Sequence, residues 1–340
     1  MSKKGRSPLR VALIGTDSLR AREIKELLST GKLPIKTMEF YDPGVEEEYS
    51  KLTDFGDEPK VIHHPYPELL EGLDLVLLAA DRETNRKFGW LAREKGYRAI
   101  DLEESFADQE DVPVVVAGIN DHLLENPEVC LVSNPHPVSI ILSHVLSAVS
   151  TSFSLKKALS VVLQPVSAYS NEGIEELADQ SFALLSSSSS SQKVFGDQVA
   201  FNFLPEVEKA DPDGFSSREK QIIQEVRKVL GPQVPLSLNL IQAPVFHVYS
   251  LAVFLELEDE VKLPQLENMF RERPIFQVQP AGSEQVTNLR VAGKEKIFIG
   301  HLRKDPFLNG GYWVWVAADN LTVGSSLNAL GIARKMFQLD

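Results

Sequence analysis

Short apolar runs that alternate with helix-like segments constrain the fold of the first hundred residues more than any other feature. Residues 10–15 (RVALIG) and 73–80 (LDLVLLAA) are apolar without alternation, which is typical of parallel strands covered on both faces. Residues 19–28 and 84–94 have the composition of crossover helices, and residues 36–41 form another strand-like run. The pattern predicts a doubly wound α/β sheet with helices on both sides.

The character of the chain changes near Asn134, and the remaining sequence predicts a mostly antiparallel α+β region. Further expected helices cover residues 138–149, 217–230 and 323–337, and further expected strands cover residues 98–101, 112–116, 159–166, 236–241, 245–258, 291–303 and 314–318. The serine run 186–191 predicts a flexible loop. We expect a first domain over residues 1–134, completed by a C-terminal helix within 320–340, and a second domain over 135–319.

The charge balance and the cysteine content exclude several classes of function. The 340 residues carry 35 Lys and Arg against 48 Asp and Glu, for a net charge of −13 without a basic run, which argues against a nucleic-acid partner. A single cysteine, Cys130, rules out an intrachain disulfide and a Cys-rich metal site, and the scattered histidines form no metal-binding pattern. No apolar run is long enough to span a membrane, and residues 11–15 are too short an apolar stretch for a signal peptide after the basic opening residues 1–6. We therefore expect a cytoplasmic protein with no membrane partner and no metal.

The turn after the first expected strand matches a phosphate-binding turn only in part. Dinucleotide folds place glycines there, so that backbone amides at a helix N-terminus can approach a pyrophosphate. Gly15 alone remains of that pattern, and Asp17 adds a negative charge where the pyrophosphate would lie. The alternative is a plain turn in which Asp17 or Ser18 caps the helix.

Asp42 ends the next expected strand, where an acidic side chain accepts hydrogen bonds from the ribose of NAD and repels the 2′-phosphate of NADP. An aspartate that only forms the turn before Pro43 and Gly44 explains the residue at least as well. Gly15, Thr16 and Asp42 are therefore candidate cofactor contacts. We expect NAD(P) binding to be weakened, with NAD favoured over NADP if either binds.

With these segments in place, the chain resembles the aspartate-semialdehyde dehydrogenase family along nearly its whole length. The matching stretches, which agree in order and spacing, are residues 11–15, 111–116, 133–137, 164–177, 201–207, 243–253, 299–306 and 318–329. The resemblance implies an α/β fold with an N-terminal Rossmann-like dinucleotide-binding domain and an α+β dimerisation and catalytic-type domain. It also implies a role in amino-acid biosynthesis and a homodimer. Residues 236–241 and 250–257 could supply an apolar dimer face, or they could cover a helix of their own domain.

The resemblance implies a cysteine nucleophile, a histidine acid/base and a nicotinamide cofactor, yet the first two are replaced in this sequence. The family's Asn-Pro-Asn-Cys motif corresponds to residues 134–137, so Pro137 takes the place of the nucleophile, and Tyr249 takes the place of the histidine. Proline has no nucleophilic side chain, and a phenol with an ordinary pKa near ~10 is a poor proton shuttle at neutral pH. Cys130 is interpreted as a small apolar packing residue. The chain is identified as a divergent family member that lacks the catalytic Cys and His.

The substrate contacts implied by the family are changed as well. The substituted positions are Gln242 for a carboxylate-binding arginine, Gln221 and Arg218 for a lysine and a glutamate, and Ala107 for a phosphate-binding arginine. A glutamine amide cannot reproduce a bidentate guanidinium–carboxylate contact. Gln164, near the family's nucleophile, and Asn320, near its cofactor, persist, although packing alone could explain both.

These losses together predict a protein without phosphorylating dehydrogenase activity that acts as a dimeric scaffold, a regulator or a binder of a small ligand. The alternative is an active NAD(P)-dependent oxidoreductase of the family with a rebuilt site, in which His136, Tyr249 and Gln164 converge and transfer protons. A third reading keeps the ancestral activity by recruiting Cys130.

Overall fold

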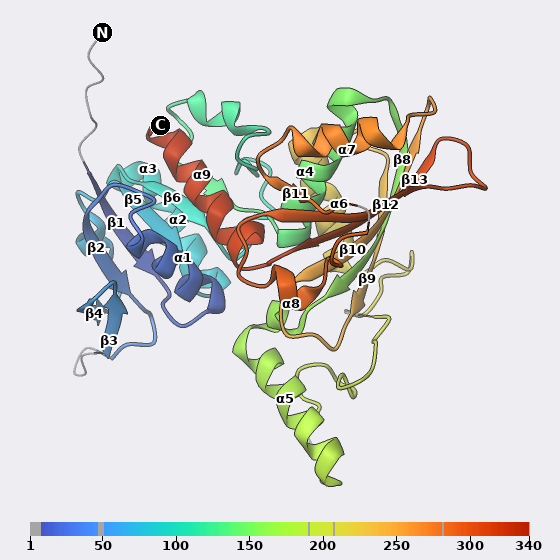
Figure 1. Cartoon of the computed structure of the whole chain (residues 1–340). Coiled ribbons are helices and arrows are strands. Elements are labelled where there is room, and N and C mark those ends of the chain that lie inside the picture. Colours follow the sequence, from blue (N-terminus) through green and yellow to red (C-terminus); the bar gives the residue numbers. More distant parts are fainter. Residues whose placement is uncertain (1–7, 47–50, 190, 207, 281, 340) are drawn as a thin grey trace. The chain divides into compact units, whose positions relative to one another are not determined.

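The computed structural model describes residues 8–46, 51–189, 191–206, 208–280 and 282–339 (Figure 1). The basic opening residues 1–6 and one member of the serine run, Ser190, lie outside the described residues. The chain divides into two compact units: unit 1 comprises Met1–His136 and Ser325–Asp340, and unit 2 comprises Pro137–Gly324. Among the described residues, no helix is long and apolar enough to cross a membrane, and no His, Cys, Asp and Glu side chains gather as a metal site.

Unit 1 contains a seven-stranded sheet in the order β3-β4-β2-β1-β5-β6-β7, in which β3 and β4 alone form an antiparallel pair. Its elements are β1 (Leu9–Ile14), α1 (Leu19–Ser29), β2 (Ile35–Tyr41), β3 (Lys51–Phe55), β4 (Glu58–His63), β5 (Leu75–Leu78), α2 (Arg82–Trp90), α3 (Ala92–Lys95), β6 (Arg98–Asp101), β7 (Leu131–Ser133) and α9 (Leu327–Met336), with 3₁₀ turns at Pro67–Leu70 and Asp121–Glu125. Alternate residues of β1 enter two separate apolar clusters, Val11 and Leu13 in one and Ala12 and Ile14 in the other. A strand buried on both faces must read as a continuous apolar run, so the predicted doubly wound sheet is confirmed.

The strand expected over residues 112–116 is wrong. The segment makes one isolated bridge, Val114 with Ser133, and the edge strand is β7. Two backbone bonds join it to β7, from the Val115 N–H to the Ser133 carbonyl and from the Ser133 N–H to the Pro113 carbonyl. Side chains hold the rest: the Val116 N–H donates to the Asn120 side chain, and the Asn328 amide of α9 donates to the Val115 carbonyl. Side chains thus take the place of a longer strand pairing, which an apolar pattern alone does not reveal. The β3–β4 hairpin was not expected, because its side chains are mostly polar and exposed.

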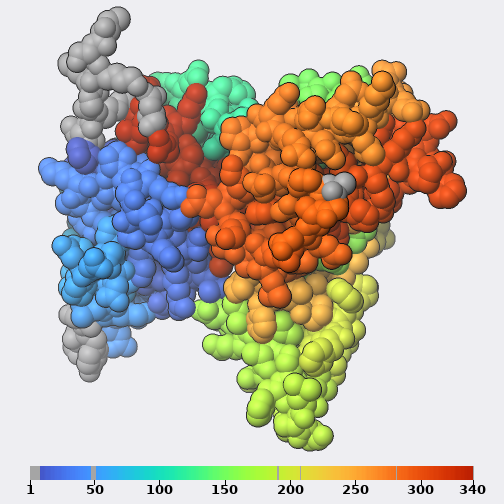
Figure 2. Space-filling view, in the orientation of Figure 1, coloured from blue at the N-terminus to red at the C-terminus, as the bar shows by residue number. Residues whose placement is uncertain are grey.

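Unit 2 contains a mixed six-stranded sheet in the order β11-β12-β13-β10-β8-β9. Its elements are α4 (Pro137–Ser152), β8 (Leu155–Gln164), α5 (Ser170–Ser186), α6 (Ser217–Leu230), β9 (Leu236–Gln242), β10 (Tyr249–Leu257), α7 (Leu263–Arg271), β11 (Phe276–Val278), α8 (Asn288–Val291), β12 (Ile297–Lys304) and β13 (Gly311–Ala318), with a 3₁₀ turn at Val166–Tyr169 and a π-helical turn at Thr322–Ser326. Three of the five strand pairs are antiparallel, which confirms the expected mostly antiparallel α+β region. Helices α4, α6 and α7 pack together over one sheet face, and α5 projects from the rest of the unit (Figures 1 and 2).

Several expected boundaries in unit 2 are corrected by backbone geometry. The strand expected over residues 245–258 begins only at Tyr249, because Val248 has a left-handed φ of 78°. Val291 ends α8 instead of starting a strand, and Gly293, with φ of 70°, turns the chain before β12. The helix expected over residues 323–337 opens as a π turn, in which the Gly324 N–H bonds to the Asp319 carbonyl. The serine run begins inside α5, which ends at Ser186.

One face of β10, within the segment 250–257 considered for a dimer, points into the protein. Leu251, Val253 and Leu255 of β10 are fully buried within the chain, so they cover the helices of their own unit, as the alternative expectation held. The opposite face of the sheet carries Leu159 and Val161 of β8, which keep 42% and 39% of their surface exposed. We name Leu159, Val161, Ala252, Phe254, Trp313 and Trp315 the open face, since these residues are paired across β8, β10 and β13.

Candidate functional site

Gly15 closes the turn between β1 and α1 by close packing. It has φ of 88°, and a Cβ at this position would lie 2.4 Å from the Ala80 nitrogen and 2.5 Å from the Ala79 carbonyl atoms. Its N–H donates to the Tyr41 carbonyl at 2.7 Å. The fold of unit 1 therefore requires glycine here whether or not a ligand binds.

The candidate cofactor contacts Thr16 and Asp42 bind each other. The Thr16 N–H and hydroxyl donate to one oxygen of the Asp42 carboxylate at 3.0 and 2.9 Å. The other carboxylate oxygen accepts the Gly44 N–H at 2.9 Å. Both oxygens thus hold the turns that follow β1 and β2, which is the geometry of the plain-turn alternative.

The N-terminus of α1 faces acidic side chains of the chain itself. Ser18 is the cap, because its hydroxyl accepts the Ala21 N–H at 3.0 Å, and the same hydroxyl donates to the Glu103 carboxylate at 3.0 Å. Asp17 instead pairs with Lys51. Of the two expected caps, Ser18 is the one present.

Arg20, on the first turn of α1, holds the acidic loop that follows β6. Its guanidinium lies 3.3 Å from a Glu103 oxygen and 2.7 Å from a Glu104 oxygen, and it also donates to the Leu102 carbonyl. Burial raises the pKa of Glu103, while the Arg20 charge and the Ser18 hydroxyl oppose that rise. Asp101 at the end of β6 accepts the Glu103 and Phe106 N–H groups, and burial raises its pKa to about 7.

Gln164, Tyr249 and Gln242 form a buried hydrogen-bond network inside unit 2, and Tyr169 also bonds to the Gln164 side chain. The Tyr249 hydroxyl donates to the Gln164 side-chain carbonyl at 3.0 Å, and the Gln164 amide donates to the Gln242 side-chain carbonyl at 3.1 Å. The Gln242 amide donates to the backbone carbonyls of Gln164 and Ala243. All three side chains are at least 97% buried and uncharged. The side chains bond to one another and to neighbouring backbone, as a structural role requires.

Pro137 begins α4, where its missing N–H leaves no helix bond unmade. It packs against Gly324, because a Cβ on that glycine would lie 2.9 Å from the Pro137 Cβ. The position of the family's nucleophile is therefore an apolar contact within unit 2. His136 is buried at the end of unit 1, and Cys130 is half-buried beside the core cluster of Ala12 and Ile14 in the same unit.

Asn320, a candidate cofactor contact, supports the backbone before β10. Its side-chain oxygen accepts the Val248 N–H at 3.2 Å and lies within bonding distance of the Ser167 hydroxyl. Neighbouring Asp319 accepts the N–H groups of Leu321, Thr322 and Gly293. Both side chains hold a left-handed residue or a turn in place.

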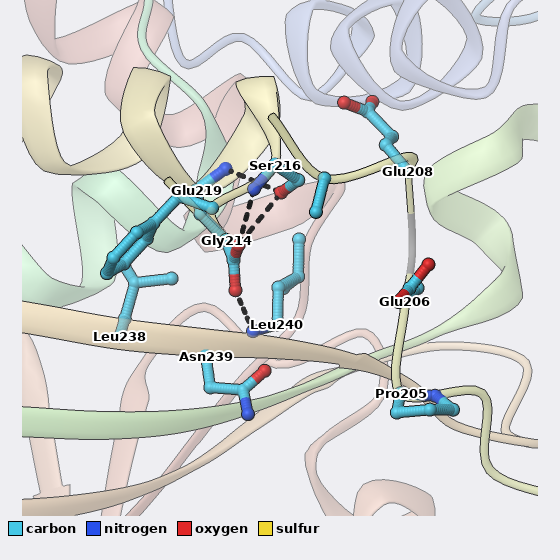
Figure 3. Close-up of a pocket in the computed structure, with 11 residues that line it drawn as sticks. Pro205, Glu206, Glu208, Gly214, Ser216, Glu219, Leu238, Asn239 and Leu240 are labelled. Atoms are coloured by element: carbon cyan, nitrogen blue, oxygen red, sulfur yellow. Dashed lines mark hydrogen bonds between the residues drawn. The ribbon is translucent and has the colours of Figure 1, made fainter. Parts of the chain in front are cut away.

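The two α6 positions where the resemblance implies substrate contacts bind other parts of unit 2. Gln221 donates to the buried Glu225 carboxylate at 2.8 Å, Ser139 of α4 donates to it at 2.7 Å, and Arg218 pairs with Glu208. A pocket of about 310 Å³ lies beside the start of α6 (Figure 3). Its buried Glu219 accepts from the Ser216 backbone and hydroxyl and from the Leu240 N–H, which completes a capping box. Glu219 therefore anchors α6 to β9.

Sequence reasoning missed two acidic residues. Glu103 places a carboxylate at the start of α1, and Glu225 binds Gln221 and Ser139 inside unit 2. Glu103 had a usable signal, because it follows β6 at the carboxyl end of a parallel sheet, where ligands of such folds bind. Glu225 had none, since it lies in an amphipathic helix with other charged residues.

Comparisons with known proteins match the chain over most of its length. A family model described as semialdehyde dehydrogenase, dimerisation domain, matches residues 146–323. The aspartate-semialdehyde dehydrogenase of Rickettsia bellii is 26% identical over 96% of this chain and 97% of its own, and that of Bacillus subtilis is 25% identical over 98% of each. The crystal structure of aspartate semialdehyde dehydrogenase II from Vibrio cholerae aligns with a TM-score of 0.90 at 22% identity, over 98% of this chain and 99% of that one. The expected two-part fold is confirmed by this structural likeness.

Proposed function

The chain belongs to the semialdehyde dehydrogenase family, and from that premise we propose that it has kept the family's fold and lost phosphorylating dehydrogenase activity. It acts instead as a dimeric scaffold, a regulator or a binder of a small ligand. One observation carries the proposal: Pro137 stands where the family resemblance places the nucleophile, and it is packed against Gly324. Without a thiolate, the covalent step of the family's chemistry has no nucleophile at this position.

The second support is the buried network of Gln164, Tyr249 and Gln242. Each of the three bonds to another member, and none carries a formal charge to clamp a substrate carboxylate. Gln221 and Arg218, at the other anchor positions, are held by Glu225 and Glu208. The side chains that would orient a substrate are therefore used to hold the protein together.

A direct assay tests this proposal. The purified protein is mixed with aspartate semialdehyde, phosphate and NAD or NADP, and the near-ultraviolet absorbance of the reduced nicotinamide is followed, with the Bacillus subtilis relative as positive control. We expect a turnover below about one ten-thousandth of the control, as when a covalent nucleophile is removed. A rate that grows in proportion to the added protein and exceeds that level would refute the proposal.

The alternative, an oxidoreductase with a rebuilt site, has one specific support. The Tyr249 hydroxyl and the Gln164 carbonyl are 3.0 Å apart and buried, a pair that could pass a proton without covalent catalysis. A dinucleotide would then have to bind. A rise in melting temperature with millimolar NAD or NADP favours this alternative, and no response to either favours the inactive scaffold.

The chain carries the family's dimerisation domain, and we propose that it forms a homodimer through the open face. Leu159 and Val161 lie on an interior strand yet remain exposed. Phe254 and Ala252 of β10 connect them to the half-buried Trp313 and Trp315 of β13. Apolar side chains in such a position are typical of an interface.

The double variant Leu159→Glu/Val161→Glu is expected to shift the protein from dimer to monomer, because it would bury like charges against each other across a two-fold axis. Light scattering after size-exclusion chromatography measures the mass. The control is Leu52→Glu, an exposed leucine on β3 of unit 1. A double variant that remains dimeric would place the interface elsewhere.

A further inference from the structure

We infer that Glu103 excludes dinucleotide phosphates from the turn between β1 and α1. This inference concerns the edge of the unit 1 sheet where the strands end and a dinucleotide would bind. It does not depend on whether unit 2 has catalytic activity. The fold implies a dinucleotide there, but the residues present do not fit one. Carboxylates of the protein itself already bind the donors of this turn.

A carboxylate of the protein already lies at the N-terminus of α1. Helix N-termini attract negative charge because their first amides have no partner within the helix. In unit 1 the Glu103 carboxylate reaches this end, 3.0 Å from the hydroxyl of the cap Ser18. Glu103 is anchored from the loop after β6, and 26% of its side chain is exposed. A phosphate at the same end would have to displace this carboxylate or accept its repulsion.

The hydrogen-bond donors of Thr16, earlier in the same turn, also have a partner. The Thr16 N–H and hydroxyl both donate to Asp42, as described above. Asp17 adds a third carboxylate to the turn, and Glu104 a fourth beside Arg20. Against these stand Arg20, bound to Glu103 and Glu104, and Lys51, bound to Asp17. The surroundings are thus negative before any phosphate arrives.

The loop that carries Glu103 is held by hydrogen bonds on both sides of that residue. Asp101 accepts the N–H groups of Glu103 and Phe106, and Arg86 donates to the Ser105 carbonyl at 2.8 Å. The next residue, Glu104, holds a left-handed φ of 60°. Moving Glu103 out of the turn would break its contact with Ser18 and loosen Arg20, so the exclusion is built into the loop.

Calorimetric titration of the full chain tests the inference at pH 8, with NADP, NAD and inorganic pyrophosphate as probes. Glu103→Gln keeps a group that can bond to Ser18 and removes the charge, and Glu103→Ser removes both the charge and the reach. We expect each variant to bind NADP at least about tenfold more tightly than the natural chain, the effect of one removed charge near a phosphate. The matched control is Glu128→Gln, which removes an exposed charge just before β7, at the amino end of that strand, and should leave affinity unchanged.

Two results would overturn the inference. If the natural chain binds NADP as tightly as Glu103→Gln, the carboxylate does not exclude it. If neither chain binds any probe, Glu103 is not the residue that prevents binding. Should both Glu103 variants fail to fold, Asp17→Asn on the exposed turn must give a gain of about threefold, and no gain contradicts the charge argument. The dehydrogenase assay reads turnover and these titrations read binding, so either proposal can fail while the other holds.

Discussion

Replacing Gly15 with alanine is expected to lower the free energy of unfolding by at least about 4 kcal/mol. The added Cβ would lie 2.4 to 2.5 Å from backbone atoms of Ala79 and Ala80, which β5 holds in place, and alanine would also be forced to a φ of 88°. Backbone strain and overpacking against atoms that cannot move add together. Equilibrium urea unfolding followed by circular dichroism measures the change.

Gly31 provides the matched control. Its φ is 78°, close to that of Gly15, but a Cβ there would meet nothing within 4 Å. Gly31→Ala should therefore cost about 1 kcal/mol, the strain of the left-handed backbone alone. If the two variants were equally stable, the close approach at Gly15 would be wrong, and its retention in the sequence would again point to a phosphate.

Gln164→Leu is expected to destabilise the protein by about 3 kcal/mol, the second large effect. Leucine has a similar size but leaves the Tyr249 hydroxyl and the Gln242 side-chain carbonyl without the partners seen in the network. Each buried polar group that loses a hydrogen-bond partner costs about 1 to 3 kcal/mol. Tyr249→Phe breaks one of these bonds and should cost about 1 kcal/mol. Urea unfolding of both variants gives the values.

The change in the free energy of unfolding shows whether Gln164 has a structural or a functional role. Side chains kept for catalysis or ligand binding are often unfavourable for stability, so their removal is neutral or stabilising. Gln233→Leu, at an exposed position, is the control and should change stability by less than about 0.5 kcal/mol. A cost at Gln164 as small as that of the control would contradict the structural role and strengthen the case for an active site.

The sequence predicted the elements whose periodicity is set by burial. The β1 and β5 strands and the α6 helix appear where their apolar spacing placed them, because each buries a face that the pattern records. Elements set by backbone hydrogen bonds were missed. The segment 112–116 is held by Asn120 and Asn328, the latter more than two hundred residues away, and the onset of β10 depends on the left-handed Val248.

The sequence predicted which residues replace the family's site residues, but it did not predict which of them touch one another. Alignment with the family gave Pro137, Tyr249 and Gln242 directly from their positions. That Gln242 and Tyr249 would meet on Gln164 depends on which strands become neighbours, since β8 lies between β9 and β10. The contact of Glu103 with Ser18 depends on the path of a loop, for which local sequence carries little signal.

The loss of covalent catalysis is tested most directly through the one cysteine of the chain. A dehydrogenase of this family forms a covalent bond to a thiol during turnover, and Cys130 is the only thiol here. The natural protein and Cys130→Ser are incubated with the semialdehyde and NADP without phosphate, and their intact masses are measured. We expect no added mass on either protein. An acyl adduct on the natural protein that is absent from Cys130→Ser would contradict this expectation.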